Sequence, residues 1–248
     1  MSASKRIHDE PAWLLHHRPF RDASRILDVL SREHGRLALV ARGSRSAKSK
    51  LRGILRPFLP LQLSWVIRAD LGTLTGAELQ GAPLALTGDA LLAGYYLNEL
   101  LLNLLHRHDA QPEIFVAYAK TIAGLAAGAD VAAALREFEI ELLRLLGYAL
   151  NLDHDTDAQQ PLDPGTRYEY RVEQGPVRVG DRDGPMMFSG EELDAIRQRR
   201  FTDPHVVRCA GRLLRRVIDF HLDGKELKSR RVLQEMRRTT EKPRSLAT

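Results

Sequence analysis

Residues 25–42, RILDVLSREHGRLALVAR, decide the fold, because two short apolar segments here flank the turn EHG. In the second segment, Leu37, Leu39 and Ala41 fall on one face, while the arginines at its two ends fall on the other. Side chains of a strand point alternately to its two faces, so this spacing indicates a strand with one buried face. The glycine of the turn can adopt a positive φ. The stretch therefore predicts a β-hairpin.

Three further segments around this hairpin also have the character of strands. The predicted strands cover residues 12–18, 25–31, 36–42, 61–68 and 73–79. Pro19 is expected to end the first strand, because proline cannot continue a central ladder, and Gly76 marks a bulge in the last. Five short strands within residues 1–81, with no long helix between the first three, are typical of a Greek-key barrel, of which the OB-fold is the five-stranded form. An SH3-like barrel gives a similar pattern.

The third predicted strand leads into residues 42–58, RGSRSAKSKLRGILRPF, which carry six cations and no acid. Burying an unpaired charge costs on the order of several kcal/mol, so this run must face solvent or an anion. Phosphate is the anion we expect, since guanidinium and ammonium groups neutralise it and release its counterions. The candidate phosphate-binding residues are Arg42, Arg45, Lys48, Lys50, Arg52 and Arg56, with Arg18, Arg21 and Arg25 as neighbours.

A solvated loop without a ligand is the competing interpretation of this run. The predicted barrel favours phosphate binding, because it places Arg36 and Arg42 on a solvent face beside the loop and a groove of one sign attracts its counter-ion. Phe20 and Phe58 flank the loop as candidate stacking platforms, although packing is the default role for either ring. Trp65 alternates with leucines and is expected in the core.

Charge is distributed unevenly along the chain. Residues 1–81 hold 14 Lys and Arg against 7 Asp and Glu, residues 82–155 hold 4 against 10, and residues 156–248 hold 19 against 15. The basic head and tail suit a polyanion, whereas the acidic middle suits a different partner. The single cysteine, Cys209, excludes an internal disulfide and a zinc site built from cysteines, and it is expected to be buried in a helix.

Targeting and catalytic motifs are absent from the sequence. The longest apolar stretch, residues 91–105, is too short and too polar to cross a bilayer, and the N-terminus lacks the apolar core of a signal peptide. We therefore expect a soluble, cytoplasmic protein without a membrane partner. No P-loop, dinucleotide-binding glycine motif, zinc-protease motif or nucleophile elbow occurs, so neither a catalytic residue nor a cofactor is predicted.

Beyond residue 82 the apolar spacing changes to that of helices. Helices are predicted at 89–107, 112–127, 131–146, 189–200, 204–222 and 228–237. The segment between the third and fourth helices is rich in proline and glycine and contains the strand-like YEYRV and PVRVG, which predicts a small irregular or β-hairpin module. Four parts follow: an OB domain at 1–81, a helical core at 82–150, the inserted module at 151–188 and C-terminal helices at 189–248.

With these segments placed, the chain resembles the bacterial RecO family of recombination mediators. The resemblance is carried by WLLHHRPFRDASRILDVLSREHGRLALVARGSRSAKSKLRGILRPFLPL at 13–61, YYLNELL at 95–101, LREFEIELLRLLGY at 135–148 and LDGKELKSR at 222–230. It implies an N-terminal OB domain followed by a helical domain with a small inserted module. Many members hold zinc in that module through four cysteines. Residues 151–188 contain no cysteine, so this zinc cannot be carried over.

The resemblance also implies a function. The protein would bind single- and double-stranded DNA, anneal complementary strands and act at the nucleoid. With RecR, and often RecF, it would help to load RecA onto strands coated by the single-stranded DNA-binding protein, SSB. No catalysis would be needed. The cations of 42–56 would then hold the DNA backbone, which lowers the repulsion between two strands without reading their sequence.

A second surface is expected for the acidic, apolar C-terminal tail of SSB, which the resemblance implies as a ligand. Such a tail needs an apolar groove with a cation at its rim. Arg136 lies beside Leu135 and Phe138 on the most amphipathic predicted helix, so these three residues are the candidates. An ion pair between Arg136 and Glu139, one helical turn away, is an equally supported interpretation.

Two rival hypotheses come from other classes of protein. Asp153, Asp155 and Asp157 alternate in sequence, and carboxylates can bind Mg²⁺ for phosphodiester cleavage by a nuclease. A solvated loop after a helix is their ordinary explanation. The other rival is an OB-type adaptor for structured RNA. A further group of cations on one predicted helix is expected to form a solvated face: Arg208, Arg212, Arg215 and Arg216.

Overall fold

The computed structural model describes residues 5–67, 70–180 and 182–232. The chain forms two compact units. Unit 1 holds the described residues of 1–126 and 226–248, and unit 2 those of 127–225. The four-part division that composition suggests stays a prediction. Within the described residues, no helix is long and apolar enough to span a membrane.

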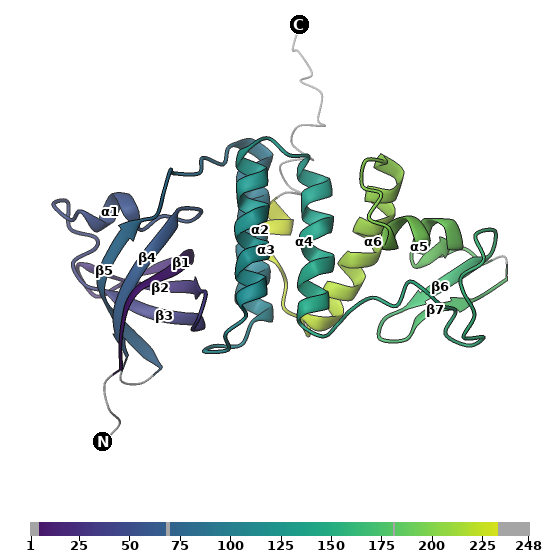
Figure 1. Ribbon diagram of the computed structural model, residues 1–248, viewed down its shortest axis with the longest axis horizontal. Coiled ribbons are helices and arrows are strands. Elements are labelled where there is room, and N and C mark those ends of the chain that lie inside the picture. The colour runs from purple at the N-terminus through teal and green to yellow at the C-terminus, as the bar shows by residue number, and fades with distance from the viewer. Residues whose placement is uncertain (1–4, 68–69, 181, 233–248) are drawn as a thin grey trace, which may run out of the picture. The chain divides into compact units, whose positions relative to one another are not determined.

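Unit 1 begins with a five-stranded barrel (Figure 1). Its strands are β1 (Lys5–Phe20), β2 (Ser24–Ser31), β3 (Gly35–Ala41), β4 (Pro60–Ile67) and β5 (Leu71–Leu79). The barrel is closed in the order β1-β2-β3-β5-β4, with β3 and β5 parallel and the other neighbouring pairs antiparallel. This is an OB-like connection, so the predicted fold class is confirmed. The predicted irregularity in β5 is also present, since its register shifts next to Gly76.

Strand β1 differs from its prediction at both ends, because it begins at Lys5 and continues through Pro19. The expectation that Pro19 ends the strand was wrong. The N-terminal half of β1 pairs with β4 as far as Trp13, and only β2 pairs with it beyond that point. A missing N–H is tolerated where one side of a strand has no partner. The long strand thereby joins two neighbours and closes the barrel.

The barrel interior is filled by alternate side chains of all five strands. Leu27, Leu39, Leu63 and Trp65 are each at most 1% exposed and belong to one apolar cluster. The prediction that Trp65 lies in the core is confirmed. Helix α1 (Leu51–Ile54) packs its apolar residues against the same cluster.

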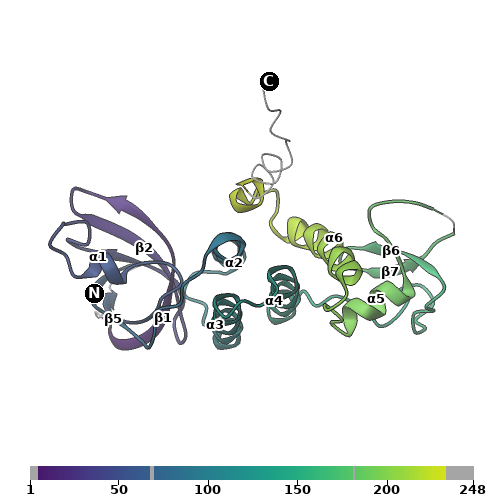
Figure 2. The ribbon, with the colours of Figure 1, turned by 90° about the horizontal axis from the view of Figure 1, so that it is seen from above.

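Helices α2 (Gly88–Leu104) and α3 (Pro112–Ala126) lie side by side against the outside of β1 (Figures 1 and 2). Trp13 meets the Tyr118 ring edge-on at 5.5 Å. Asn98 donates to the Leu15 carbonyl at 2.8 Å and accepts from the Tyr118 hydroxyl at 2.6 Å. In the sequence Asn98 merely interrupts an apolar stretch. In the fold its amide supplies a hydrogen-bond partner for the Leu15 carbonyl, where the register of β1 shifts between Leu14 and His16.

Unit 2 contains three helices and a small sheet. The helices are α4 (Val131–Leu145), α5 (Gly190–Arg197) and α6 (Pro204–His221), and the strands are β6 (Arg167–Arg171), β7 (Gly175–Arg178) and β8 (Met187–Ser189). The sheet order is β7-β6-β8, and both pairs are antiparallel. A capping box begins α5, since Ser189 accepts from the Glu192 N–H and Glu192 accepts from the Ser189 N–H. A last helix begins at residue 228, and its predicted part beyond residue 232 lies outside the described residues.

The inserted module coheres through packing rather than through cysteines. Tyr168 and Phe188 are at most 1% exposed in the sheet. The guanidinium of Arg212 on α6 lies 4.4 Å from the centroid of the Phe188 ring and donates to the Met187 carbonyl at 2.9 Å. Arg212 therefore fastens the sheet to α6 by stacking and a hydrogen bond, which is a use of arginine that lysine matches poorly.

Candidate nucleic-acid interface

Residues 42–56 form a series of turns that ends in α1. All six cations of this segment, Arg42, Arg45, Lys48, Lys50, Arg52 and Arg56, are exposed. The apolar side chains of the same segment point the other way, and Leu55 is 1% exposed in the barrel core. Ser44 is also buried and donates to the Ala41 carbonyl at 2.8 Å. The segment, called the basic loop from here on, is thus anchored by its uncharged residues and presents its charges outward.

The basic loop is fastened to the turn between β1 and β2. The Arg45 N–H donates to the Ala23 carbonyl at 2.9 Å, and its guanidinium donates to the Arg21 carbonyl at 3.3 Å. The guanidinium of Arg21 lies 5.2 Å from the centroid of the Phe20 ring. Two predicted site residues that are distant in sequence, Arg21 and Arg45, are therefore brought together.

Strand pairing places the other predicted arginines on different sides of the sheet. Arg18 pairs with Ile26, which pairs with Val40, so Arg18 shares the outer face with the end of β3 that leads to Arg42. Arg25 pairs with Ala41, whose side chain faces the core. Because faces alternate along a strand, half-buried Arg25 lies on the opposite side from Arg18, at the end of the barrel.

The cations of the basic loop have no ion-pair partner among the residues that the structure describes. Among the described residues, no carboxylate lies within ion-pair distance of its six cations or of Arg21 and Arg25. Arg18 differs, since its guanidinium lies 3.8 Å from the Asp28 carboxylate, which Arg107 and His16 also approach. Desolvation lowers the pKa of His17, and the charges of Arg25 and His16 lower it further. A group of cations without carboxylate partners therefore lies on the basic loop and the adjoining turn.

One expectation about the surroundings of the basic loop was wrong, and for Phe58 the default packing role is confirmed. Arg36 is half-buried rather than on a solvent face, because its Nε donates to the Leu105 carbonyl at 3.1 Å. Desolvation, and then the nearby charge of Arg107, lower its pKa. Phe58 is 4% exposed and packs edge-on against Tyr95, so it offers no stacking platform. Phe20 remains partly exposed beside Arg21.

Helix α4 holds the residues predicted to bind the SSB tail. The Arg136 guanidinium pairs with Glu139 at 2.8 Å, and their side chains are 17% and 2% exposed. Phe138 is 2% exposed. The intrahelical ion pair is thus present, and a tail bound here would have to compete with Glu139. The tail contact itself stays a prediction.

The aspartates of the nuclease hypothesis have separate surroundings, and only the carboxylate of Asp155 holds the turn. Asp155 is 2% exposed, and its carboxylate accepts from the N–H groups of Asp157 and Ala158 at 2.9 and 3.1 Å. Asp153 instead lies 3.5 Å from Arg197. The Asp155 carboxylate therefore shapes the loop. Within the described residues, the three aspartates do not form a group whose geometry could hold a metal ion.

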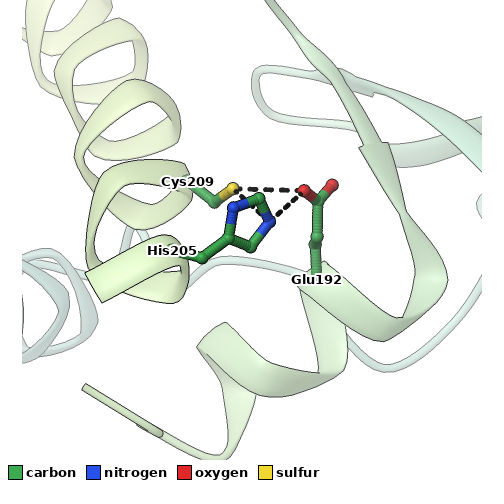
Figure 3. A group of neighbouring side chains, drawn as sticks. All are labelled: Glu192, His205 and Cys209. Carbon is green, nitrogen blue, oxygen red and sulfur yellow. Dashed lines mark hydrogen bonds and ion pairs between the residues drawn. The ribbon is translucent and has the colours of Figure 1, made fainter. Parts of the chain in front are cut away.

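A different group of side chains was missed as a cluster by sequence reasoning. Glu192 on α5 meets His205 and Cys209 on α6 (Figure 3). Cys209 is buried in its helix, as predicted. The signal that was overlooked is the spacing of four between a histidine and a cysteine on one predicted helix, which puts both on the same face.

Taken together, the fold and the surface define an OB-barrel protein with an unpaired cationic loop at the barrel rim and helices that follow the barrel in the chain. OB barrels commonly bind oligonucleotides through their outer face and loops. Two family profiles match this chain: "Recombination protein O N terminal" over residues 5–82 and "Recombination protein O C terminal" over residues 85–231. The chain belongs to the recombination protein O (RecO) family.

Curated relatives agree over nearly the whole length. A protein named DNA repair protein RecO from Aromatoleum aromaticum is 44% identical over 237 residues, which cover 95% of this chain and 99% of the relative. One of the same name from Dechloromonas aromatica is 43% identical over 240 residues, with 95% and 99% covered. That from Nitrosococcus oceani is 42% identical over 234 residues, with 94% and 95% covered. This family membership supports a role in DNA repair and recombination.

Proposed function

We propose that this protein is a recombination mediator that binds single- and double-stranded DNA through the basic loop and anneals complementary strands. With RecR, and with RecF where required, it helps to load RecA onto DNA coated by SSB. It acts without catalysis, in the cytoplasm at the nucleoid. The mediator role and its partners come from the family resemblance, and the DNA site comes from the geometry of the barrel.

One observation carries the DNA-binding part of the proposal. The six cations of the basic loop are exposed, and none has a carboxylate partner among the described residues. In unit 2, most surface cations that lie near acids form ion pairs. The Arg199 guanidinium, for example, contacts the carboxylates of Glu137 and Glu141 at 2.7 and 3.1 Å. A phosphate can therefore bind these cations without first breaking an ion pair.

Annealing follows from binding of this kind. Two complementary strands repel each other through their phosphates, and a cationic surface that holds both reduces this repulsion. Contacts to the backbone carry no sequence information, so any complementary pair can be joined. Arg21 and Phe20, beside the loop, add a cation and an aromatic face on which an unpaired base can stack.

The proposal is tested by annealing of complementary fluorescent oligonucleotides, with and without SSB, in the absence of magnesium and ATP. We expect the protein to accelerate annealing and to leave both strands at full length on a denaturing gel. A nuclease would shorten strands when magnesium is restored. Competition by structured RNA that exceeds competition by DNA would support the RNA adaptor instead. Annealing at the spontaneous rate would refute the proposal.

The contact with SSB is proposed on α4, at Leu135, Arg136 and Phe138. It is supported by the amphipathic character of this helix and by the cation next to its apolar face. Since Arg136 is paired with Glu139, the acidic tail would take over the place of that carboxylate. Neutralising Glu139 should therefore strengthen the binding of the tail.

A further inference from the structure

Three side chains that belong to no part of the proposed DNA site converge between α5 and α6 (Figure 3). The Glu192 Oε1 atom lies 2.8 Å from His205 Nε2 and 3.2 Å from Cys209 Sγ. His205 Nε2 and Cys209 Sγ are 3.5 Å apart. A carboxylate oxygen, an imidazole nitrogen and a sulfur thus surround one point, and the three donor atoms all lie within 4.8 Å of one another.

Local structure brings the three donors together before any ligand arrives, and it holds Glu192 most firmly. His205 and Cys209 are four residues apart on α6, so they lie one above the other on the same face. Glu192 occupies the third position of α5, where its Oε2 accepts from the Ser189 N–H at 2.8 Å. The capping box therefore holds one carboxylate oxygen and directs the other toward α6. At metal sites, hydrogen-bond donors that are not ligands themselves commonly orient the ligands in this way.

The distances suit a tetrahedral ion of the size of Zn²⁺. With bond lengths of about 2.3 Å to sulfur and about 2.0–2.2 Å to nitrogen and oxygen, neighbouring donors in a tetrahedron lie roughly 3.3–3.6 Å apart. The separation of Cys209 from His205 is already 3.5 Å, and that from Glu192 is 3.2 Å. The separation of His205 and Glu192, at 2.8 Å, has to open, and that of Cys209 and Glu192 has to widen slightly. A small outward rotation of the His205 ring, whose side chain is 56% exposed, supplies the first of these changes.

We propose that Glu192, His205 and Cys209 bind one divalent transition-metal ion of the zinc class, with water in the fourth position, and that this ion fastens α5 to α6. Thiolate and imidazole donors favour such an ion over Mg²⁺ or Ca²⁺, which prefer oxygen. On binding, the Cys209 S–H bond is lost, its proton goes to solvent and the sulfur keeps the electron pair for the metal. The imidazole gives the lone pair of a neutral nitrogen. Two negative ligands then balance the charge of the ion, and no redox step is involved.

This site differs from the four-cysteine zinc of other family members, since its ligands lie outside residues 151–188 and include one cysteine. It is also independent of the proposed DNA site, which lies on the barrel. The same contacts suit a hydrogen-bonded group without an ion, in which His205 pairs with Glu192 and the thiol keeps its proton. The two alternatives differ in the state of the thiol, which can be measured.

The test uses the full chain without a polyhistidine tag, with Zn²⁺ as ligand and Co²⁺ as a spectroscopic probe. We expect saturable binding of one ion per chain, and a thiolate-to-metal charge-transfer band with Co²⁺. Because Cys209 is the single cysteine of the chain, a thiol reagent reports on this site alone. Zn²⁺ should slow its modification at least tenfold, and a chelator should restore the original rate.

The ligands are tested by Glu192→Gln, His205→Ala and Cys209→Ala. Glutamine is accepted at the third position of a capping box, so Glu192→Gln removes the carboxylate while keeping the start of α5. Loss of a group that only hydrogen-bonds to a ligand weakens metal binding ~10- to 100-fold, and loss of a ligand itself should weaken Zn²⁺ binding by more than this. The matched control is Glu191→Gln, which removes the same charge from the exposed neighbouring residue and should bind as the unchanged protein does.

Equal Zn²⁺ affinity in the three ligand variants would overturn the proposal, and so would a thiol that reacts at the same rate with and without Zn²⁺. The second measurement is made on the unchanged protein, so it decides the matter even if a variant fails to fold. Neither result depends on DNA binding or annealing, so the proposed metal site and the proposed DNA site can fail separately.

Discussion

Glu99 and Ser229 are joined by two hydrogen bonds although 130 residues separate them, since the Glu99 carboxylate accepts from the Ser229 N–H at 2.9 Å and from its hydroxyl at 2.6 Å. The same carboxylate accepts from the Lys228 N–H at 2.9 Å. Residue 228 begins the last described helix, so Glu99 of α2 caps a helix N-terminus that it does not belong to. The returning segment is thereby fastened to unit 1.

Glu99→Gln should release this segment, because a neutral amide is a weaker acceptor for two N–H groups and loses the favourable interaction with the positive end of the helix. We expect a loss of about 0.5–2 kcal/mol in unfolding free energy, the usual range for a lost cap. Hydrogen exchange at residues 228 and 229 should accelerate. Glu78→Gln, which removes the same charge from an exposed strand position, should leave that exchange unchanged.

Arg45, Lys48 and Lys50, replaced together by Ala, should weaken DNA binding and reduce its salt dependence. Each lost phosphate contact lowers the slope of log K against log salt by about 0.7 for single strands and about 0.9 for duplex. A charge-matched comparison is provided by Arg208, Arg215 and Arg216, which are exposed on α6 and are also replaced by Ala. If the α6 variant loses affinity and the loop variant does not, the DNA site belongs to α6.

A pair of variants on α4 tests the SSB contact. Arg136→Ala should weaken binding of an SSB tail peptide at least tenfold in a fluorescence titration, because the cation at the rim is gone. Glu139→Gln should strengthen binding, since the carboxylate that competes for Arg136 is neutralised. Thermal unfolding of both variants serves as the control for folding. Unchanged peptide affinity in both would assign Arg136 a purely structural role within α4.

The ion pairs of Arg199 predict an effect of pH on stability. Arg144 and Arg199 together lower the pKa of Glu141 in the folded protein through hydrogen bonds and charge. A carboxylate of this kind stabilises the fold above its unfolded pKa, near 4.5, and the contribution is lost as pH falls through the lowered folded pKa.

Replacing Arg199 should therefore destabilise at neutral pH and matter little in acid. We expect Arg199→Ala to cost about 0.5–1 kcal/mol at pH 7, because both carboxylate partners are partly exposed. The cost should shrink below the folded pKa of Glu141, as measured by urea unfolding. Arg208→Ala, which removes an exposed cation from α6, should show no such dependence on pH. A cost that stayed constant with pH would mean that packing, rather than charge, explains the role of Arg199.

The barrel was predictable from sequence because its strands alternate, and Leu37, Leu39 and Ala41 all face the core as their spacing indicates. The helix starts were predictable for a similar local reason, since Ser189 forms a capping box with Glu192. Pro19 was misjudged because its tolerance depends on which strands lie beside it, and that is a property of the closed barrel.

The candidate site was only partly predictable. A run of cations without acids is visible in sequence, but Arg36 was assigned to solvent because the segment that covers it comes 69 residues later. The opposite sides taken by Arg18 and Arg25 follow from strand register. Cys209 was considered alone, since local patterns do not show that two helices bring Glu192 and His205 to it. Contacts between distant parts of a chain are what sequence spacing leaves undetermined.

The return of the chain to unit 1 also affects the order in which the protein can be completed on the ribosome. The partners of Glu99 are made 129 and 130 residues after it. At about 5–20 residues per second, this delay is roughly 6–26 s. The barrel precedes Glu99 in the chain, while the end of α2, all of α3 and all of unit 2 are synthesised during that interval. Unit 1 is therefore the first part of the protein to start folding and the last to be finished.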